Sequence, residues 1–161
     1  MIPFERVFRL LNAHDIRYVI VGGIAVILHG SPRLTADLDI VIDLEPARAR
    51  TVIDVLQGAG FVAEVPVDIR EFADENVRRS WIAEKHMKAL SLHDGEMPPT
   101  VLDILAESPI PFEDLYGRAK VVSIDEITLR IAAIPDLIAL KRLSGRPEDL
   151  RDIEELEKIN G

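Results

Sequence analysis

The stretch from Val21 to Ile40, VGGIAVILHGSPRLTADLDI, constrains the fold of this chain more than any other. The apolar residues 18–21 before it predict a buried strand, which must end at the consecutive glycines Gly22 and Gly23. A helix is expected over residues 24–29, and a second strand over residues 37–43. Strand, tight turn, helix and strand in close succession indicate a layered structure in which helices cover a β-sheet.

The rest of the chain continues this alternation of strands and helices. We therefore predict an α/β (or α+β) fold with a mixed β-sheet flanked by helices. The other expected strands are residues 61–65, 86–92, 100–105, 121–124 and 127–131, and the other expected helices are residues 4–13, 47–57 and 112–116. Residues 68–85 fit either a helix or a mixture of strand and helix.

A C-terminal helical pair is expected at about residues 135–160. Pro135 and Pro147 stand at first-turn positions, and Gly145 between them is a helix stop. The apolar residues at helical spacing should form the inner faces of the two helices. These are Leu137, Ile138, Leu140 and Leu143 in the first helix, and Leu150, Ile153, Leu156 and Ile159 in the second.

Length and composition favour a single cytoplasmic domain spanning residues 1–161. The chain has no cysteine, which excludes disulfides and thiolate zinc sites. No apolar run approaches the roughly 20 residues needed to span a bilayer, and we expect no membrane contact. The net charge of −9 disfavours a large, sequence-independent nucleic-acid footprint, because such binding neutralises phosphates.

Asp37 and Asp39 are candidate metal ligands. Residues two apart on a strand face the same way, so both carboxylates should project to one side of the sheet. Their mutual repulsion would be relieved by a divalent cation, and Mg²⁺ favours oxygen ligands. The alternative is a strand edge whose acids simply face water.

Three further features could complete a site around this pair. Gly22 and Gly23 could expose backbone N–H groups to a phosphate at a helix N-terminus, or could serve only a tight turn. Arg33 could contact phosphates or pair with Asp37. Thr35 could donate to the carboxylates or cap the turn.

Asp103 is the third candidate acid. It stands in the apolar run TVLDIL, where a lone carboxylate is costly to bury unless it is paired or metal-bound. An adjacent strand could bring it beside Asp37 and Asp39, where it would act as a general base or a third metal ligand. An edge position open to water is the alternative.

The C-terminal helical pair offers Lys141, Asp149 and Asp152. Lys141 could reach nucleotide phosphates, while the two acids, three residues apart on one helical face, orient it or bind the base or ribose. A solvated helical hairpin with ion pairs is the competing interpretation.

Together these residues resemble the nucleotidyltransferase superfamily, whose fold is that of the polymerase-β palm. The pattern of that superfamily is a glycine pair at a strand–helix turn, Asp-x-Asp on the next strand and a distant third Asp. The R-x-T-x-D-x-D form, from Arg33 to Asp39, is similar to the small bacterial abortive-infection-type toxin nucleotidyltransferases. Lys141, Asp149 and Asp152 match the later Lys and Asp-rich helix of that subgroup.

The resemblance implies an Mg²⁺-dependent enzyme, with two ions at Asp37, Asp39 and Asp103. It would bind a nucleoside triphosphate, with Gly22 and Gly23 on the β- and γ-phosphates, and transfer the nucleoside monophosphate to a tRNA or protein hydroxyl. A toxin–antitoxin role with an antitoxin partner is implied as well. The alternatives are a non-catalytic nucleotide- or partner-binding domain of the same fold, and an α/β scaffold with incidental acids.

Overall fold

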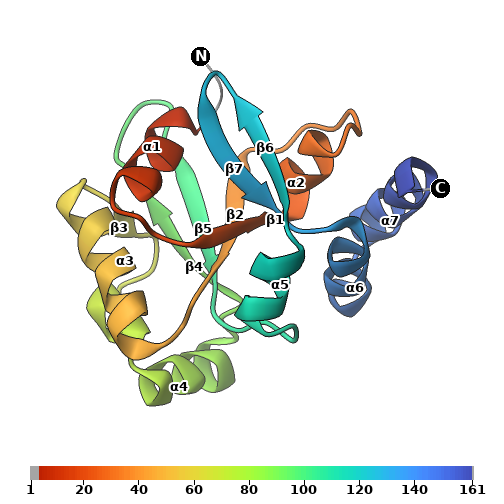
Figure 1. The fold of residues 1–161 in the computed structure, drawn as a ribbon. Coiled ribbons are helices and arrows are strands. Elements are labelled where there is room, and N and C mark those ends of the chain that lie inside the picture. The colour runs from red at the N-terminus through yellow and green to blue at the C-terminus, as the bar shows by residue number, and fades with distance from the viewer. Residues whose placement is uncertain (1–3, 161) are drawn as a thin grey trace.

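A seven-stranded mixed sheet forms the centre of the protein in a computed structural model that describes residues 4–160 (Figure 1). The strand order is β3-β4-β5-β2-β1-β7-β6. The strands are β1 (Tyr18–Val21), β2 (Asp37–Ile42), β3 (Val62–Ala63), β4 (Ala89–His93), β5 (Val101–Leu105), β6 (Lys120–Ile124) and β7 (Ile127–Ile131). The prediction of a mixed sheet flanked by helices is confirmed.

The centre of the sheet combines both strand directions. β2 runs antiparallel to β1 but parallel to β5, and β1 runs parallel to β7. The parallel pairings join strands far apart in sequence, as a crossover connection requires. This arrangement places β2 between β1 and β5.

Helices cover the sheet and extend beyond one side of it (Figure 1). They are α1 (Glu5–Ala13), α2 (Gly22–Leu28), α3 (Pro46–Gly58), the 3₁₀ helix η1 (Ile69–Ala73), α4 (Glu75–Lys85), α5 (Phe112–Arg118), α6 (Ile134–Ser144) and α7 (Pro147–Asn160). α6 and α7 pack chiefly against each other, off to the side of the sheet. Within residues 4–160, no helix is both long and apolar enough to cross a bilayer.

The core lies at the central strands. All four residues of β1 are buried, so this strand is covered on both faces. In β5, Leu102 and Ile104 are fully buried, while the alternating residues Val101, Asp103 and Leu105 are half-buried. Each such side chain contributes on the order of 1.5–3 kcal/mol through removal from water, which makes these strands the rigid support of any site built on them.

Residues 68–85, expected to be a helix or a mixture of strand and helix, form the 3₁₀ helix η1 followed by the α-helix α4. The Asp74 side chain accepts hydrogen bonds from the backbone N–H groups of Asn76 and Val77, which fixes the start of α4. His86 ends α4 in the left-handed conformation, with φ of 54°. The strand predicted from residue 86 therefore begins at Ala89 instead.

The C-terminal helical pair is present, but its predicted inner faces are partly wrong. Ile153 and Leu156 are buried as expected, whereas Leu143, Leu150 and Ile159 are exposed. Their helical spacing alone could not reveal that the pair lies beside the sheet, where each helix is covered over only part of its circumference.

Candidate active site

The register between β2 and β5 brings the predicted acids together. Asp39 lies directly opposite Asp103 in the parallel pairing of these strands. Asp37 is two residues before Asp39, so its side chain projects from the same face. The sheet therefore gathers three carboxylates from two neighbouring strands.

These carboxylates are partly buried and repel one another. Burial, followed by the charge of Asp103, a hydrogen bond with Asp103 and the charge of Asp37, raises the pKa of Asp39 to about 7, although Lys141 acts in the opposite direction. Burial and then Asp103 also raise the pKa of Asp37. Asp103 Oδ1 is buried and has no hydrogen-bond partner among residues 4–160, which is a costly arrangement for a carboxylate oxygen.

The glycine pair begins α2 directly after the end of β1 at Val21. Gly22 has a φ of 67°, and a Cβ added there would lie 2.2 Å from Asp39 Oδ2. A Cβ added at Gly23 would lie 2.9 Å from Thr35 Oγ1. Glycine at both positions therefore lets the backbone approach the carboxylates and the Thr35 side chain closely.

Arg33 pairs with α7 and not with Asp37, whose pairing was one of the two roles that the sequence left open for it. Its Nη1 donates to Asp152 Oδ2, and its Nη2 lies 3.8 Å from Glu148 Oε2. Asp152 is almost fully buried, and a buried carboxylate attracts a guanidinium strongly. This contact ties the loop before β2 to the C-terminal helical pair.

Lys141 lies at the centre of the same ion network. It is buried, with Nζ 2.8 Å from Asp152 Oδ2 and 3.6 Å from Asp149 Oδ1. Asp152 Oδ2 therefore accepts from Lys141 as well as Arg33. Both acids contact Lys141, and orienting it was one of the roles that the sequence left open for them.

Arg146 belongs to this network and was missing from the predicted site. Its Nε donates to Asp149 Oδ2 at 3.1 Å, and its backbone N–H donates to the same atom at 3.2 Å. Burial would raise the pKa of Asp149, but the hydrogen bonds from Arg146 and Ser144 and the charge of Arg146 together outweigh it and lower the pKa. The spacing of Arg146 and Asp149, three residues apart at a helix start, was the available signal.

The three acids offer carboxylate oxygens, the type of donor that a divalent cation prefers. Within residues 4–160, however, no three acidic or histidine side chains are placed so that they could already hold a metal ion. A cation bound here would contact Asp103 Oδ1, which lacks a hydrogen-bond partner among the described residues, and would offset the repulsion that raises the pKa of Asp39. Hard oxygen donors of this kind suit Mg²⁺.

The sequence matches one family model over residues 4–160, nearly its whole length. That family is described as a nucleotidyltransferase of unknown function, DUF6036. The chain belongs to this nucleotidyltransferase family. The nucleotidyltransferase matches none of the curated proteins with which it was compared.

Solved structures of nucleotidyltransferases share its fold. The lincosamide antibiotic adenylyltransferase LnuA, solved with lincomycin bound, superposes with a TM-score of 0.61 at 18% identity, over 96% of this chain and 94% of LnuA. ANT(2″)-Ia, solved with adenylyl-2″-tobramycin, gives a TM-score of 0.60 at 11% identity, over 98% of this chain and 87% of that chain. At such identities the likeness establishes the fold, which is that of the nucleotidyltransferase superfamily.

Proposed function

We propose that this nucleotidyltransferase transfers a nucleoside monophosphate from a nucleoside triphosphate to an acceptor hydroxyl, with a divalent cation held by Asp37, Asp39 and Asp103. The observation that carries the proposal is the registered pair of Asp39 and Asp103 beside the backbone of Gly22. Juxtaposed carboxylates next to an unobstructed strand–helix turn suit a phosphate-bearing substrate.

In this reaction the acceptor oxygen bonds to the α-phosphorus while the bond to pyrophosphate breaks. Asp103 Oδ1, which has no hydrogen-bond partner, is available to accept the hydroxyl proton. Mg²⁺ bound at the three acids would supply charge neutralisation on the phosphate oxygens. The protein contributes mainly by positioning the substrates and by complementary charge.

Arg33 and Lys141 are the proposed phosphate-binding cations. Both already share Asp152, so the acid presets their positions before a triphosphate arrives. Arginine and lysine bind phosphate by charge-assisted hydrogen bonds. Gly22 and Gly23 are proposed to receive the β- and γ-phosphates, following the pattern of the superfamily.

For the acceptor we propose a protein hydroxyl. Of the four basic residues beside the site, Lys141, Arg142, Arg146 and Arg151, the first three pair with Asp152, Glu157 and Asp149 of α7. These pairs would have to open before the three cations could contact a tRNA backbone, whose binding needs several phosphate contacts. The fully exposed Leu34, in the loop between Arg33 and Thr35, gives the same region an apolar contact instead.

The test is labelling of a cell extract with each α-³²P nucleoside triphosphate in Mg²⁺. We expect a labelled band that protease removes and ribonuclease leaves, and that Asp39→Asn or Asp103→Asn lowers by at least about a hundredfold. Asp54→Asn, at an exposed position of α3, is the matched control and should label normally. Undiminished labelling by the Asp39 variant would exclude the proposed site.

Other outcomes separate the remaining possibilities. Label sensitive to ribonuclease would assign a tRNA acceptor, and label in the small-molecule fraction would assign an acceptor of the kind seen with LnuA. Nucleotide binding by calorimetry without pyrophosphate release would indicate a binding domain. A toxin role predicts growth arrest on expression of the wild type, relieved by Asp39→Asn.

A further inference from the structure

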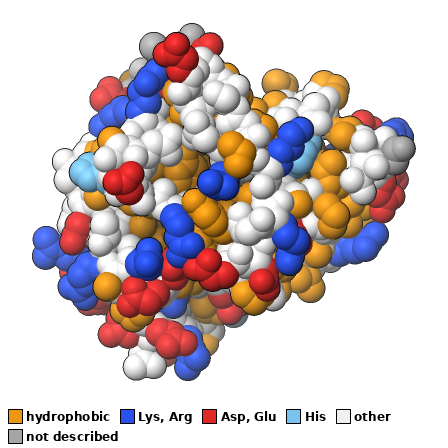
Figure 2. Space-filling view, in the orientation of Figure 1, with side chains coloured by type: hydrophobic (Ala, Val, Ile, Leu, Met, Phe, Trp, Pro, Cys, Tyr) orange, Lys and Arg blue, Asp and Glu red, His pale blue; other side chains and the backbone are white. Residues whose placement is uncertain are grey.

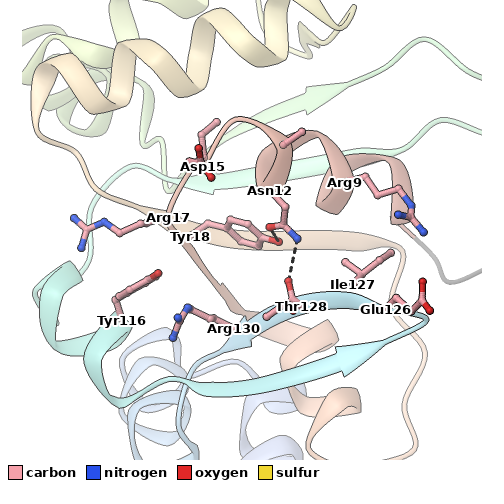
Figure 3. A pocket seen from close by; sticks show the side chains of 12 residues that line it. Arg9, Asn12, Asp15, Arg17, Tyr18, Tyr116, Glu126, Ile127, Thr128 and Arg130 are labelled. Atoms are coloured by element: carbon pink, nitrogen blue, oxygen red, sulfur yellow. Dashed lines mark hydrogen bonds between the residues drawn. The ribbon is translucent and has the colours of Figure 1, made fainter.

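A large hollow lies away from the carboxylates, at the other end of β1 (Figure 3). Its volume is about 740 Å³, and its walls come from the end of α1, the start of β1, α5 and the beginning of β7. β1 leads from Tyr18 at this hollow to Gly22 at the carboxylates, and strand geometry makes that path roughly 10–13 Å long. None of the predicted catalytic residues lines the hollow.

The lining is positive although the chain is acidic. It contains Arg9, Arg17 and Arg130 against Asp15 and Glu126, whereas the whole chain has a net charge of −9. Figure 2, in the orientation of Figure 1, shows basic side chains interspersed with acidic and apolar ones on this face of the molecule. A local excess of arginine on such a surface favours an anionic ligand.

The three arginines that line the hollow differ in whether an acidic side chain pairs with them. Arg17 donates to Glu113 and to Asp43, and Arg9 pairs with Glu5. In the described part of the chain, Arg130 makes no ion pair. Its guanidinium instead lies over the Tyr116 ring, 4.5 Å from the ring centroid.

Arg130 and Tyr116 belong to a column of stacked groups. The guanidinium of Arg17 lies 5.2 Å from the Phe112 ring centroid and 5.1 Å from that of Tyr116, and Arg130 also contacts Tyr116. Guanidinium planes stack on nucleobases as they do on aromatic rings. Arg130 can therefore offer hydrogen-bond donors to an anion and a flat surface to a ring.

The opposite wall is held by hydrogen bonds. Tyr18 Oη donates to Asn12 Oδ1 at 3.1 Å, and Asn12 Nδ2 donates to the Thr128 carbonyl at 3.0 Å, across the hollow in Figure 3. Burial raises the pKa of the Tyr18 hydroxyl, so this wall remains neutral at physiological pH. The hollow is thus bordered by hydrogen-bonded residues of α1, β1 and β7, and by Arg130, the arginine of its lining for which the described residues provide no ion pair.

We propose that this hollow is a second ligand site, which binds a nucleoside monophosphate. The phosphate would be bound by Arg130 and the base would lie against the aromatic and guanidinium planes. A hollow of about 740 Å³ falls within the roughly 300–1,000 Å³ typical of small-molecule sites. The net charge of −9 favours a free nucleotide over the end of a nucleic-acid strand, whose further phosphates would be repelled.

The experiment is calorimetric titration of the full chain with adenosine monophosphate, in EDTA so that metal-dependent binding at the carboxylates is suppressed. We expect one-site binding that Arg130→Gln weakens by about tenfold or more, through loss of a charge-assisted contact. Arg50→Gln, at an exposed position of α3 outside the hollow, is the matched control and should bind normally. Absence of binding by the wild type would overturn the proposal.

Two further measurements use only the wild-type protein, so they do not depend on whether a variant folds. In ¹H–¹⁵N spectra, adenosine monophosphate should shift amides of residues 12–18 and 126–130, and shifts confined to residues 22–39 would contradict the proposal. Inorganic phosphate should bind more weakly than the monophosphate, and equal affinity would rule out a contribution from the base. A 5′-phosphorylated oligonucleotide should also bind more weakly, and tighter binding would overturn the choice of a free nucleotide.

Discussion

The protonation of Asp39 couples the proposed site to the stability of the whole fold. Burial and the charge of Asp103 raise its pKa from 3.8 to about 7. Between these two values the folded protein retains a proton that the unfolded chain releases. Its stability therefore decreases as pH rises through this window, since the folded state binds more protons there.

Asp39→Asn should consequently stabilise the metal-free protein most at high pH. Asparagine does not ionise, so the cost of a buried charge beside Asp103 disappears. Because about 1 kcal/mol moves Tm by roughly 2–4 °C in a chain of this size, we expect a Tm several degrees above the wild type at pH 8 and a smaller difference at pH 5. Thermal denaturation in EDTA measures this, and a difference that grows toward acid pH would contradict it.

Gly22 is tested by adding a single methyl group. In Gly22→Ala the new Cβ would meet Asp39 Oδ2 at 2.2 Å, at a φ of 67° that alanine adopts poorly. We expect transfer activity to fall by at least about tenfold, together with a loss of roughly 1–3 kcal/mol in stability. Gly95→Ala is the matched control: Gly95 has a φ of 75° with no atom within 4 Å, so backbone strain remains without the clash. Equal activity of the two variants would show that close approach at Gly22 is unimportant.

At the scale of elements, the strands of the site could be predicted from the sequence but their alignment could not. The apolar runs around Asp39 and Asp103 identify two strands, and alternation identifies the face of each acid. Nothing local specifies that Asp39 lies opposite Asp103, because this register depends on a parallel pairing between distant segments. The match to a known motif supplied what periodicity alone could not.

The partner of Arg33 was unpredictable for a similar reason. Asp37 is its neighbour in sequence, but the carboxylate that Arg33 contacts belongs to α7, 119 residues further along the chain. Only the packing of α6 and α7 beside the loop before β2 creates that pair. The exposure of Leu150 has the same origin, since it depends on which part of α7 faces another element.

The attachment of the C-terminal helical pair should depend strongly on Asp152. Asp152→Asn removes the charge that both Arg33 and Lys141 contact, and leaves the buried Lys141 with only Asp149, at 3.6 Å. Breaking a buried ion pair on one side costs on the order of 3–5 kcal/mol, so we expect a loss of about 3 kcal/mol in urea denaturation. Glu157→Gln, which breaks the exposed pair with Arg142, should change stability by less than about 1 kcal/mol. Similar effects of both variants would argue that the network is ordinary surface charge.

At the scale of the whole molecule, the distribution of charge favours a protein acceptor over an RNA acceptor. Two of the basic residues in α4 already have partners, because Arg78 donates to the Phe72 carbonyl and Arg79 pairs with Glu75. Beside the site, Lys141, Arg142 and Arg146 likewise pair with acids of α7. With a net charge of −9, the protein offers little that would compensate the phosphates of a long RNA.

The salt dependence of transfer should therefore be shallow. A protein that neutralises six to ten phosphates loses roughly 10³–10⁵ in affinity between about 50 and about 200 mM salt, through release of counterions. If the proposed protein acceptor is correct, kcat/KM for the labelled acceptor should change by less than about tenfold over that interval. The rate is measured at fixed Mg²⁺ and saturating nucleoside triphosphate, so that screening at the nucleotide site contributes little. A steep decline would instead indicate an RNA acceptor, because a protein hydroxyl carries no counterion atmosphere to release.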